Sequence, residues 1–173
     1  MMALVAPARR EDVDDAVAAL HREHYRSLVR LVSVLLDDVG DCEEVVQEAF
    51  VRLHLRWDRL RDTSRAPAWL RSAALNGARS RLRHRRVVDR HGPAPAGFAD
   101  SAEAGAMASA AHDEVLAALR TLPDRQREAL ALRFYLDLSE AEMAEVMGVS
   151  PGSVKTHVHR GLKALAERLG EER

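Results

Sequence analysis

The chain of 173 residues contains only one cysteine, Cys42, and aromatic residues make up just 4% of it. A single thiol excludes an internal disulfide framework and the usual multi-cysteine zinc sites. No apolar run reaches the roughly 18 residues that a membrane span needs, and the N-terminal stretch MMALVAPARREDVDD lacks the apolar centre of a signal peptide. These absences predict a cytoplasmic protein that is neither secreted nor inserted in a membrane.

Alanine, leucine, arginine and glutamate are abundant, and because these residues favour helices the composition predicts an all-α protein. Apolar residues at steps of three and four predict a first helix over Glu11–Leu36. Asp41 is expected to cap a second helix, with Glu44 completing a capping box. The second helix then buries Val45 and its apolar neighbours.

Polar residues and proline set the next boundaries. The segment Arg59–Ser64 is polar and is expected to be a loop, and Pro67 fits the first turn of a third helix. We therefore predict a disordered tail over residues 1–10 and a three-helix domain over 11–91. Residues 92–112 are mostly Ala, Gly, Pro and Ser and predict a flexible linker. Fully extended, it would span roughly 70 Å, so the two halves are expected to act at separated sites.

Residues 113–170 predict a second, four-helix domain. The pair Leu122–Pro123 breaks its first helix, and the next helix is expected to turn Leu130 and Phe134 inward. The stretch SEAEMAEVMGVSPGSVKTHVHRGLKAL (139–165) has the proportions of a helix-turn-helix, with a short helix, a glycine-containing turn and a second helix.

Caps mark both helices of this motif. Ser139 and Glu142 form a capping box, and Ser150 caps the second helix with Pro151 at its first position. The second helix has the polar face of a major-groove reader. Its predicted buried stripe is Val154, Val158, Leu162 and Leu165, and its outward candidates for DNA contact are Ser153, Lys155, Thr156, His157, His159 and Arg160.

Charge is distributed unevenly although the net charge is only −1. Residues 65–91 hold eight arginines and one acid, and residues 150–168 hold four cations and one acid. Two basic segments on an otherwise acidic chain are typical of two surfaces that contact phosphates.

Three ordered motifs resemble one family. The stretch DCEEVVQEAFVRLHLRW (41–57), the helix AWLRSAALNGARSRLRHRR (68–86) and the segment 122–165 resemble region 2, the helix that follows it and region 4 of bacterial RNA polymerase sigma factors. The chain is most similar to the extracytoplasmic-function (ECF) group, particularly its actinobacterial sigma-E-type subfamily. The resemblance implies a fold of two small helical domains joined by a flexible linker. The first would be a region 2 three-helix bundle and the second a region 4 four-helix domain that contains the helix-turn-helix.

This resemblance implies roles for particular residues. The V-Q-E-x-F helix of the family docks on a coiled coil of the polymerase's largest subunit, and region 4 meets the flap. The matching docking candidates are Asp41, Glu44, Val45, Gln47, Glu48 and Arg52. A loop before the W-L helix, aided by an asparagine of that helix, traps an unpaired base of the −10 element. The matching −10 and backbone candidates are Arg61, Asp62, Thr63, Ser64, Arg71, Asn76, Arg79, Arg81 and Arg83, while the outward residues of the last helix would contact the −35 element.

The predicted function is therefore a promoter-specificity subunit that binds core RNA polymerase and promoter DNA, with no catalytic activity, no cofactor and no metal. The resemblance also implies an inhibitory anti-sigma factor, which no residue identifies. One alternative is a stand-alone helix-turn-helix regulator that binds an operator without polymerase. A second alternative, a small helical enzyme or adaptor, lacks a convergent His, Asp and Glu cluster: His21 and His24 share one helix without a matching second pair.

Overall fold

A computed structural model of the chain describes residues 10–91 and 110–171. The described residues form α-helices and two short 3-10 helices and no strand, which confirms the all-α prediction. The helices are α1 (Arg10–Leu35), α2 (Val39–Arg56), η1 (Trp57–Arg59), η2 (Thr63–Arg65), α3 (Ala66–His91), α4 (Ala110–Arg120), α5 (Asp124–Tyr135), α6 (Glu140–Met147) and α7 (Pro151–Glu171). We call α1–α3 with η1 and η2 the N-terminal unit, and α4–α7 the C-terminal unit.

The helix caps are partly those that the sequence predicts. Ser139 and Glu142 form the predicted capping box of α6, and Gly148 ends that helix in the left-handed conformation at φ 68°. The cap of α2 was placed wrongly. Asp38, not Asp41, is the N-cap, and its carboxylate accepts from the backbone N–H of Asp41 at 2.7 Å. An aspartate at either position can accept a hydrogen bond from a free backbone N–H at the start of the helix, so the local sequence does not distinguish the two positions.

The N-terminal unit is held together by one apolar face of each long helix. Leu31 and Val32 of α1, Leu53 of α2 and Leu70 of α3 are all fully buried. The helices α2 and α3 approach so closely that a Cβ on Gly77 would lie 2.8 Å from Cγ1 of Val45. Glycine is required at this crossing because a larger residue would force the stiff Val45 side chain to shift.

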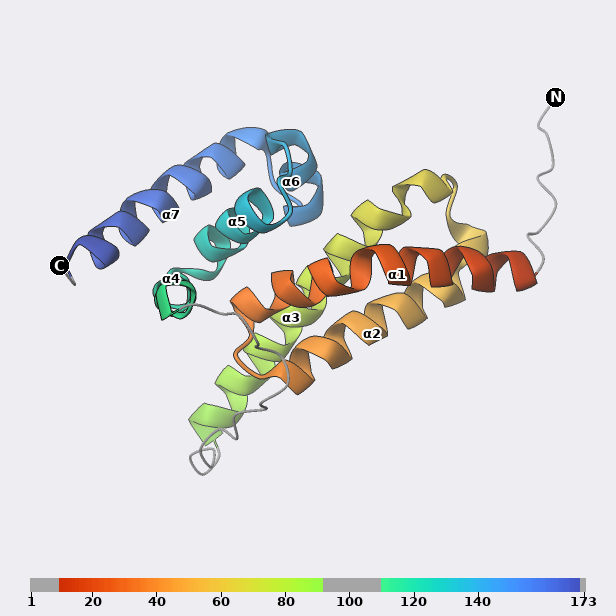
Figure 1. The fold of residues 1–173 in the computed structure, drawn as a ribbon, viewed down its shortest axis with the longest axis horizontal. Coiled ribbons are helices and arrows are strands. Elements are labelled where there is room, and N and C mark those ends of the chain that lie inside the picture. The colour runs from red at the N-terminus through yellow and green to blue at the C-terminus, as the bar shows by residue number, and fades with distance from the viewer. Residues whose placement is uncertain (1–9, 92–109, 172–173) are drawn as a thin grey trace.

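The two units pack directly against each other. Figure 1 shows the C-terminal unit beside the C-terminal half of α1, where α5 contacts α1 and α6 contacts α3. Their buried apolar residues form a continuous core, so that Leu35 of α1 and Leu132 of α5 belong to the same cluster. The sequence does not predict this contact, since it favours halves that act apart. The predicted linker lies outside the described residues up to 109, and its last residues, 110–112, open α4.

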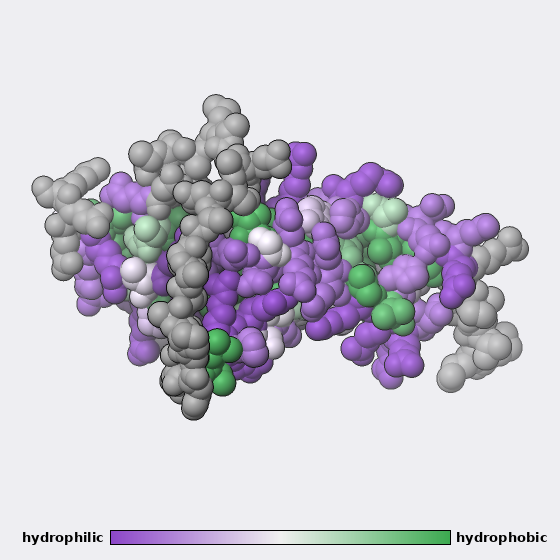
Figure 2. All heavy atoms as spheres, turned by 90° about the horizontal axis from the view of Figure 1, so that it is seen from below, coloured by the Kyte–Doolittle hydropathy of each residue, from purple (hydrophilic) through white to green (hydrophobic). Residues whose placement is uncertain are grey.

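The described helices include none that is long and apolar enough to cross a membrane. On the face drawn in Figure 2, hydrophilic side chains dominate and hydrophobic ones form small, separate patches. The large apolar residues that remain most exposed among the described ones are Val51, Leu55, Val87, Val88, Phe134 and Leu162. Phe134 is 63% exposed, so its predicted inward position is wrong, whereas Leu130 on the same helix is buried as expected.

The single thiol is sealed inside the N-terminal unit. Cys42 is 1% exposed, and burial, with the nearby carboxylates of Asp38 and Asp41, raises its pKa to about 12. We expect the folded chain to react with iodoacetamide at pH 8 on the order of a thousand times more slowly than the chain unfolded in guanidinium, because the thiolate is the reactive form. Mass spectrometry of the alkylated protein measures both rates. Similar rates in the two states would contradict the buried position.

Candidate functional site

The outer face of α2 combines acidic and exposed apolar residues. Glu44, Gln47, Glu48, Val51 and Arg52 line a shallow hollow of about 280 Å³. Glu48 pairs with Arg52 one turn on, at 3.1 Å, and both side chains are about half exposed. Because the pair is exposed, it contributes little to the stability of the fold, and exchanging it for contacts with another protein would cost little.

Two apolar residues extend this face beyond the acidic ones. Val51 is 59% exposed and Leu55 is 75% exposed, four residues further along α2. The sequence reasoning missed both. The sequence does indicate their exposure, however, because the helical spacing places both residues outside the stripe that α2 buries. Val45, a predicted docking residue, is 3% exposed and packs against Gly77 where α2 crosses α3.

An ion-pair network joins α2 to α3. Arg85 donates to Asp37 at 2.6 Å and to Asp41 at 2.5 Å. Arg81 lies 3.4 Å from the Asp41 carboxylate and also pairs with Glu44. Burial alone would raise the pKa of Asp37, but the hydrogen bond and charge of Arg85 outweigh it and lower that pKa. Part of the predicted docking charge and part of the predicted phosphate-binding charge therefore neutralise each other in this structure.

The segment before α3 is a compact corner rather than an open loop. Asp62 accepts from the backbone N–H of Ser64 at 3.0 Å and from its hydroxyl at 2.6 Å, and these hydrogen bonds lower the pKa of Asp62. Arg61 and Thr63 are exposed beside them. The corner borders a hollow of about 400 Å³ whose wall includes Arg61, Asp62, Arg65, Trp69, Ser72 and, from the C-terminal unit, Glu145.

A second hollow lies on the other side of Trp69. Its volume is about 330 Å³, and it is lined by Arg52, Arg56, Trp69, Ser72, Ala73 and Asn76. Trp69 is only partly buried and lines both hollows. The corner itself has no aromatic residue, so Trp69 is the aromatic surface that the sequence reasoning did not find there.

Asn76 and Arg79 act together on the exposed side of α3. Nη1 of Arg79 donates to Oδ1 of Asn76 at 2.8 Å. Nε and Nη2 of Arg79 donate to the two carboxylate oxygens of Glu128 in α5, each at 2.7 Å. Arg83 is exposed, whereas Nε of Arg71 is buried without a hydrogen-bond partner among the described residues. The predicted phosphate-binding arginines thus differ strongly in their accessibility.

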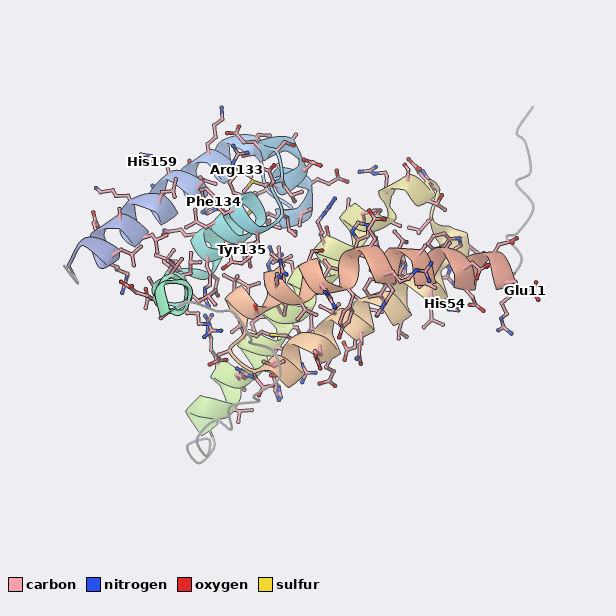
Figure 3. The ribbon with its side chains drawn as sticks, in the orientation of Figure 1. Glu11, His54, Arg133, Phe134, Tyr135 and His159 are labelled. Carbon is pink, nitrogen blue, oxygen red and sulfur yellow. The ribbon has the colours of Figure 1, made fainter. Side chains whose placement is uncertain are left out.

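The last helix presents a polar face at its N-terminal end. Ser150 caps α7 as predicted, accepting from the backbone N–H of Ser153 at 3.2 Å. Lys155, Thr156, His159 and Arg160 are exposed, and Ser153 and His157 are partly exposed. Figure 3 shows His159 on the side of α7 that faces away from α5. Among the described residues, none forms a hydrogen bond or ion pair with the side chains of His159 and Arg160.

The inner side of α7 differs from the predicted stripe at one position. Val154 is buried, and Val158 and Leu165 are partly buried, but Leu162 is 41% exposed. Gly161 takes the contact position instead, because a Cβ there would lie 3.1 Å from Leu130 of α5. The absence of a side chain at Gly161 lets α5 and α7 approach, and this rotates Leu162 outward.

Comparisons with known proteins agree on both units. Residues 20–87 match the family description "Sigma-70 region 2", and residues 112–165 match "Sigma-70, region 4". An RNA polymerase sigma-E factor of Streptomyces avermitilis is 32% identical over 150 residues, 86% of this chain and 82% of that protein. The ECF RNA polymerase sigma factor SigL of Mycobacterium tuberculosis is 32% identical over 162 residues, 88% of each chain.

Two solved structures share the fold. The sigma factor RpoE of Bartonella quintana, in complex with the anti-sigma factor NepR, superposes with a TM-score of 0.69 at 24% identity and covers 90% of this chain and 99% of its own. CnrH, in complex with the cytosolic domain of CnrY, superposes with a TM-score of 0.70 at 23% identity over 95% of this chain and 98% of its own.

Proposed function

The chain belongs to the sigma-70 family of RNA polymerase sigma factors, in its extracytoplasmic-function group, and from this premise we propose how its two units divide the work. As a sigma factor, it binds core RNA polymerase and directs promoter recognition and transcription initiation. The N-terminal unit, residues 11–91, docks on polymerase and engages the −10 element. The C-terminal unit, residues 113–170, reads the −35 element through α7.

Docking uses the outer face of α2. Gln47 and Glu48 are exposed beside the apolar Val51 and Leu55, and an acidic rim around an apolar centre is the pattern of a protein interface. An acidic surface next to nucleic acid repels phosphates, so it is better suited to a basic protein partner. Asp41 and Glu44 contribute once their pairs with Arg81 and Arg85 are exchanged for pairs with the partner. The coiled coil of the largest polymerase subunit is the expected partner, with the flap as the partner of the C-terminal unit.

Promoter contacts come from both basic surfaces. The exposed N-terminal end of α7 presents Lys155 and Arg160 to the major groove and its phosphates, helped by the positive end of the helix dipole. At the −10 element, the corner over residues 61–64 and Asn76 border the hollows on either side of Trp69. A hollow of 330–400 Å³ suits a single unpaired base, whose extrusion costs a few kcal/mol and is offset by polar contacts and stacking.

A sigma factor of this kind acts in the cytoplasm without catalysing a reaction itself. The Bartonella sigma factor that shares the fold is bound to an anti-sigma factor, NepR, and CnrH is bound to the cytosolic domain of CnrY. We include an anti-sigma factor among the partners of this chain, one that covers the α2 face and so competes with polymerase.

Binding to core RNA polymerase tests this function. The purified chain is mixed with core enzyme and run on a sizing column, and we expect it to co-elute in a one-to-one complex. Tight binding to promoter DNA in the absence of polymerase, without co-elution, would instead support a stand-alone regulator. The observation that carries the proposal is the exposed acidic and apolar face of α2 on a chain with a separate DNA-reading helix.

The base-trapping role of Asn76 gives a separate prediction. Asn76→Ala is expected to slow open-complex formation about 10-fold or more while closed-complex binding changes little, because a trapped base exists only after melting. The fold should survive, since the two hydrogen bonds from Arg79 to Glu128 do not involve Asn76. Permanganate reactivity of unpaired thymines measures melting, and a gel shift measures binding. Ser80→Ala, an exposed change one turn further along α3, is the matched control; equal losses in both assays would count against the role.

A further inference from the structure

Three arginines of the N-terminal unit are bound by carboxylates of the C-terminal unit. Arg79 forms its two-pronged pair with Glu128 of α5 at 2.7 Å. Arg86 donates to both oxygens of Asp124, also in α5, at 3.0 Å. Arg65, just before α3, pairs with Glu145 of α6. The three pairs follow one another along α3, from its start to its last turns.

Glu128 is the unusual member of this set. Its side chain is only 1% exposed, and the arginine that contacts both of its carboxylate oxygens, Arg79, belongs to the other unit. Arg79 grips it with Nε and Nη2, which is the fork geometry that arginine also uses for a phosphate. Arg125 of the same helix contacts Glu128 at 3.1 Å, so the carboxylate keeps a cationic partner when Arg79 leaves. Separation of the units therefore does not strand a lone charge.

Glu145 occupies a similar position at the neighbouring hollow. It lines the same 400 Å³ hollow as Arg61, Asp62 and Trp69, and its carboxylate pairs there with Arg65. With the C-terminal unit in place, an acidic side chain thus lines the space assigned to the −10 base. Two independent contacts, one on α3 and one at the corner, put negative charge where nucleic acid is expected.

The surrounding contacts show that this arrangement is a formed interface. Arg127 of α5 is 8% exposed and donates to the carbonyl of Leu35, at the C-terminal end of α1. Arg120 donates to the carbonyl of Ser33 at 3.1 Å. Cations at the negative end of a helix are favourable. The interface consequently combines the apolar core that the two units share with charged groups that salt or another polyanion can replace.

We propose that the carboxylates of Glu128 and Glu145 stand in for backbone phosphates, so that the C-terminal unit competes with nucleic acid for the N-terminal unit of the same chain. The inference rests on the proposed function, since it takes Arg79 and the corner as DNA-contacting. In this closed form Arg65 and Arg79 are occupied by carboxylates of the C-terminal unit, while Asn76 and the outer face of α7 stay exposed. Phosphates of promoter DNA gain these two arginines only when α5 and α6 leave α3.

The three ion pairs differ in how far solvent screens them. The side chains of Arg65 and Glu145 are 63% and 49% exposed, and those of Arg86 and Asp124 are 56% and 33% exposed, so solvent screens both pairs. The pair of Arg79 and Glu128 is largely shielded from water and resists displacement most strongly. Glu128 is therefore the residue whose neutralisation should release the surface.

The test uses the full chain without polymerase and a fluorescein-labelled, mixed-sequence single strand of 20 nucleotides. Phosphate contacts need no particular sequence, so this probe reports on the surface directly. We expect Glu128→Gln with Glu145→Gln to bind the strand about 10-fold or more tightly than the wild-type chain at 50 mM KCl, measured by fluorescence anisotropy. Glu43→Gln with Glu114→Gln makes the same change in net charge at exposed positions of α2 and α4 and should raise affinity less than about threefold.

A second comparison assigns the gain to Arg79. Adding Arg79→Ala to the double glutamine variant should remove most of the gain, whereas adding Arg22→Ala, an exposed arginine of α1, should remove little of it. Circular dichroism establishes that each variant is folded. If Glu128→Gln prevents folding, Asp124→Asn with Glu145→Gln should still strengthen binding at least threefold. The new amide oxygen at position 124 can still accept from the largely buried Arg127, which Asp124 contacts at 3.0 Å.

Wild-type affinity for the strand in the folded glutamine variants would overturn the inference, as would a gain that survives Arg79→Ala. Neither result touches the proposed function, because co-elution of the wild-type chain with core polymerase is measured separately. Loss of that co-elution with a preserved gain in DNA affinity would reject the proposed function while leaving the intramolecular competition standing.

Discussion

Glu48→Lys is expected to weaken binding to core RNA polymerase on the order of 10- to 100-fold and to abolish transcription that depends on this chain. Glu48 lies in the middle of the α2 face and lines its hollow beside Val51 and Arg52. Reversing a charge at the centre of an interface replaces an attraction by a repulsion, whose cost of one to several kcal/mol appears as this loss of affinity. Titration of labelled core enzyme measures the dissociation constant.

The control for this change lies on the same helix. Glu43 is exposed, does not line the hollow, and carries the same charge as Glu48. Glu43→Lys should therefore leave polymerase affinity within about threefold of the wild-type value. Both variants should fold, because Glu48 contributes only an exposed pair with Arg52. Equal losses for the two variants would mean that long-range charge, and not the α2 face, determines binding.

Lys155→Ala combined with Arg160→Ala is expected to reduce initiation at −35-dependent promoters about 100-fold while polymerase binding is unchanged. Both side chains are exposed, and within the described residues Lys155 has one ion pair, at 3.5 Å with the exposed Glu140. A cationic contact to a base or phosphate is worth roughly 1–3 kcal/mol, so the loss of two contacts gives an effect of this size. Run-off transcription measures initiation, and the sizing column measures polymerase binding.

A matched variant separates groove contacts from general attraction to DNA. Lys163→Ala with Arg168→Ala removes the same charge from the C-terminal half of α7, beyond the part expected to enter the groove. It should cost less than about 10-fold. Lost co-elution with polymerase in the Lys155 and Arg160 variant would show that the two units do not divide the work as proposed.

Much of the fold followed from local rules in the sequence. The capping box of Ser139 and Glu142 and the start of α7 at Pro151 depend on neighbours within four residues, so the pattern predicts them well. The predictions failed where a distant contact decides. Leu162 falls on the expected stripe, but the close approach of α5 at Gly161 turns it outward. Phe134 is likewise exposed although its spacing from Leu130 is that of a buried residue.

The sequence predicts which kinds of surface the candidate site contains, but not which of their side chains pair with each other. The sequence indicates an acidic docking helix and two basic surfaces, because charge and amphipathic spacing are visible in it. It does not indicate that Arg79 meets Glu128, 49 residues away, or that Arg81 and Arg85 turn back to the acidic start of α2. The first pairing depends on how the two units pack, and the others depend on how α3 crosses α2. No local pattern encodes either arrangement. His54 offers a similar case, since it pairs at 2.6 Å with Asp14 of α1, 40 residues earlier (Figure 3).

The closed arrangement changes what polymerase has to do. Polymerase is expected to bind α2 at one site and the C-terminal unit at another. Binding at both sites together would draw α5 and α6 away from α3. The binding energy of two docking sites, joined through one chain, is then available to break the pairs between the units. We therefore expect Arg65 and Arg79 to become available to DNA on polymerase and to stay paired with Glu145 and Glu128 in the free chain.

Run-off transcription with purified core polymerase on a pooled library of genomic promoter fragments tests the central claim most directly. The account predicts that the wild-type chain directs core enzyme to a defined set of start sites, that these sites share −35 and −10 sequences, and that Glu48→Lys removes them. Transcripts identical to those of core enzyme alone, from a chain shown to be folded, would contradict it.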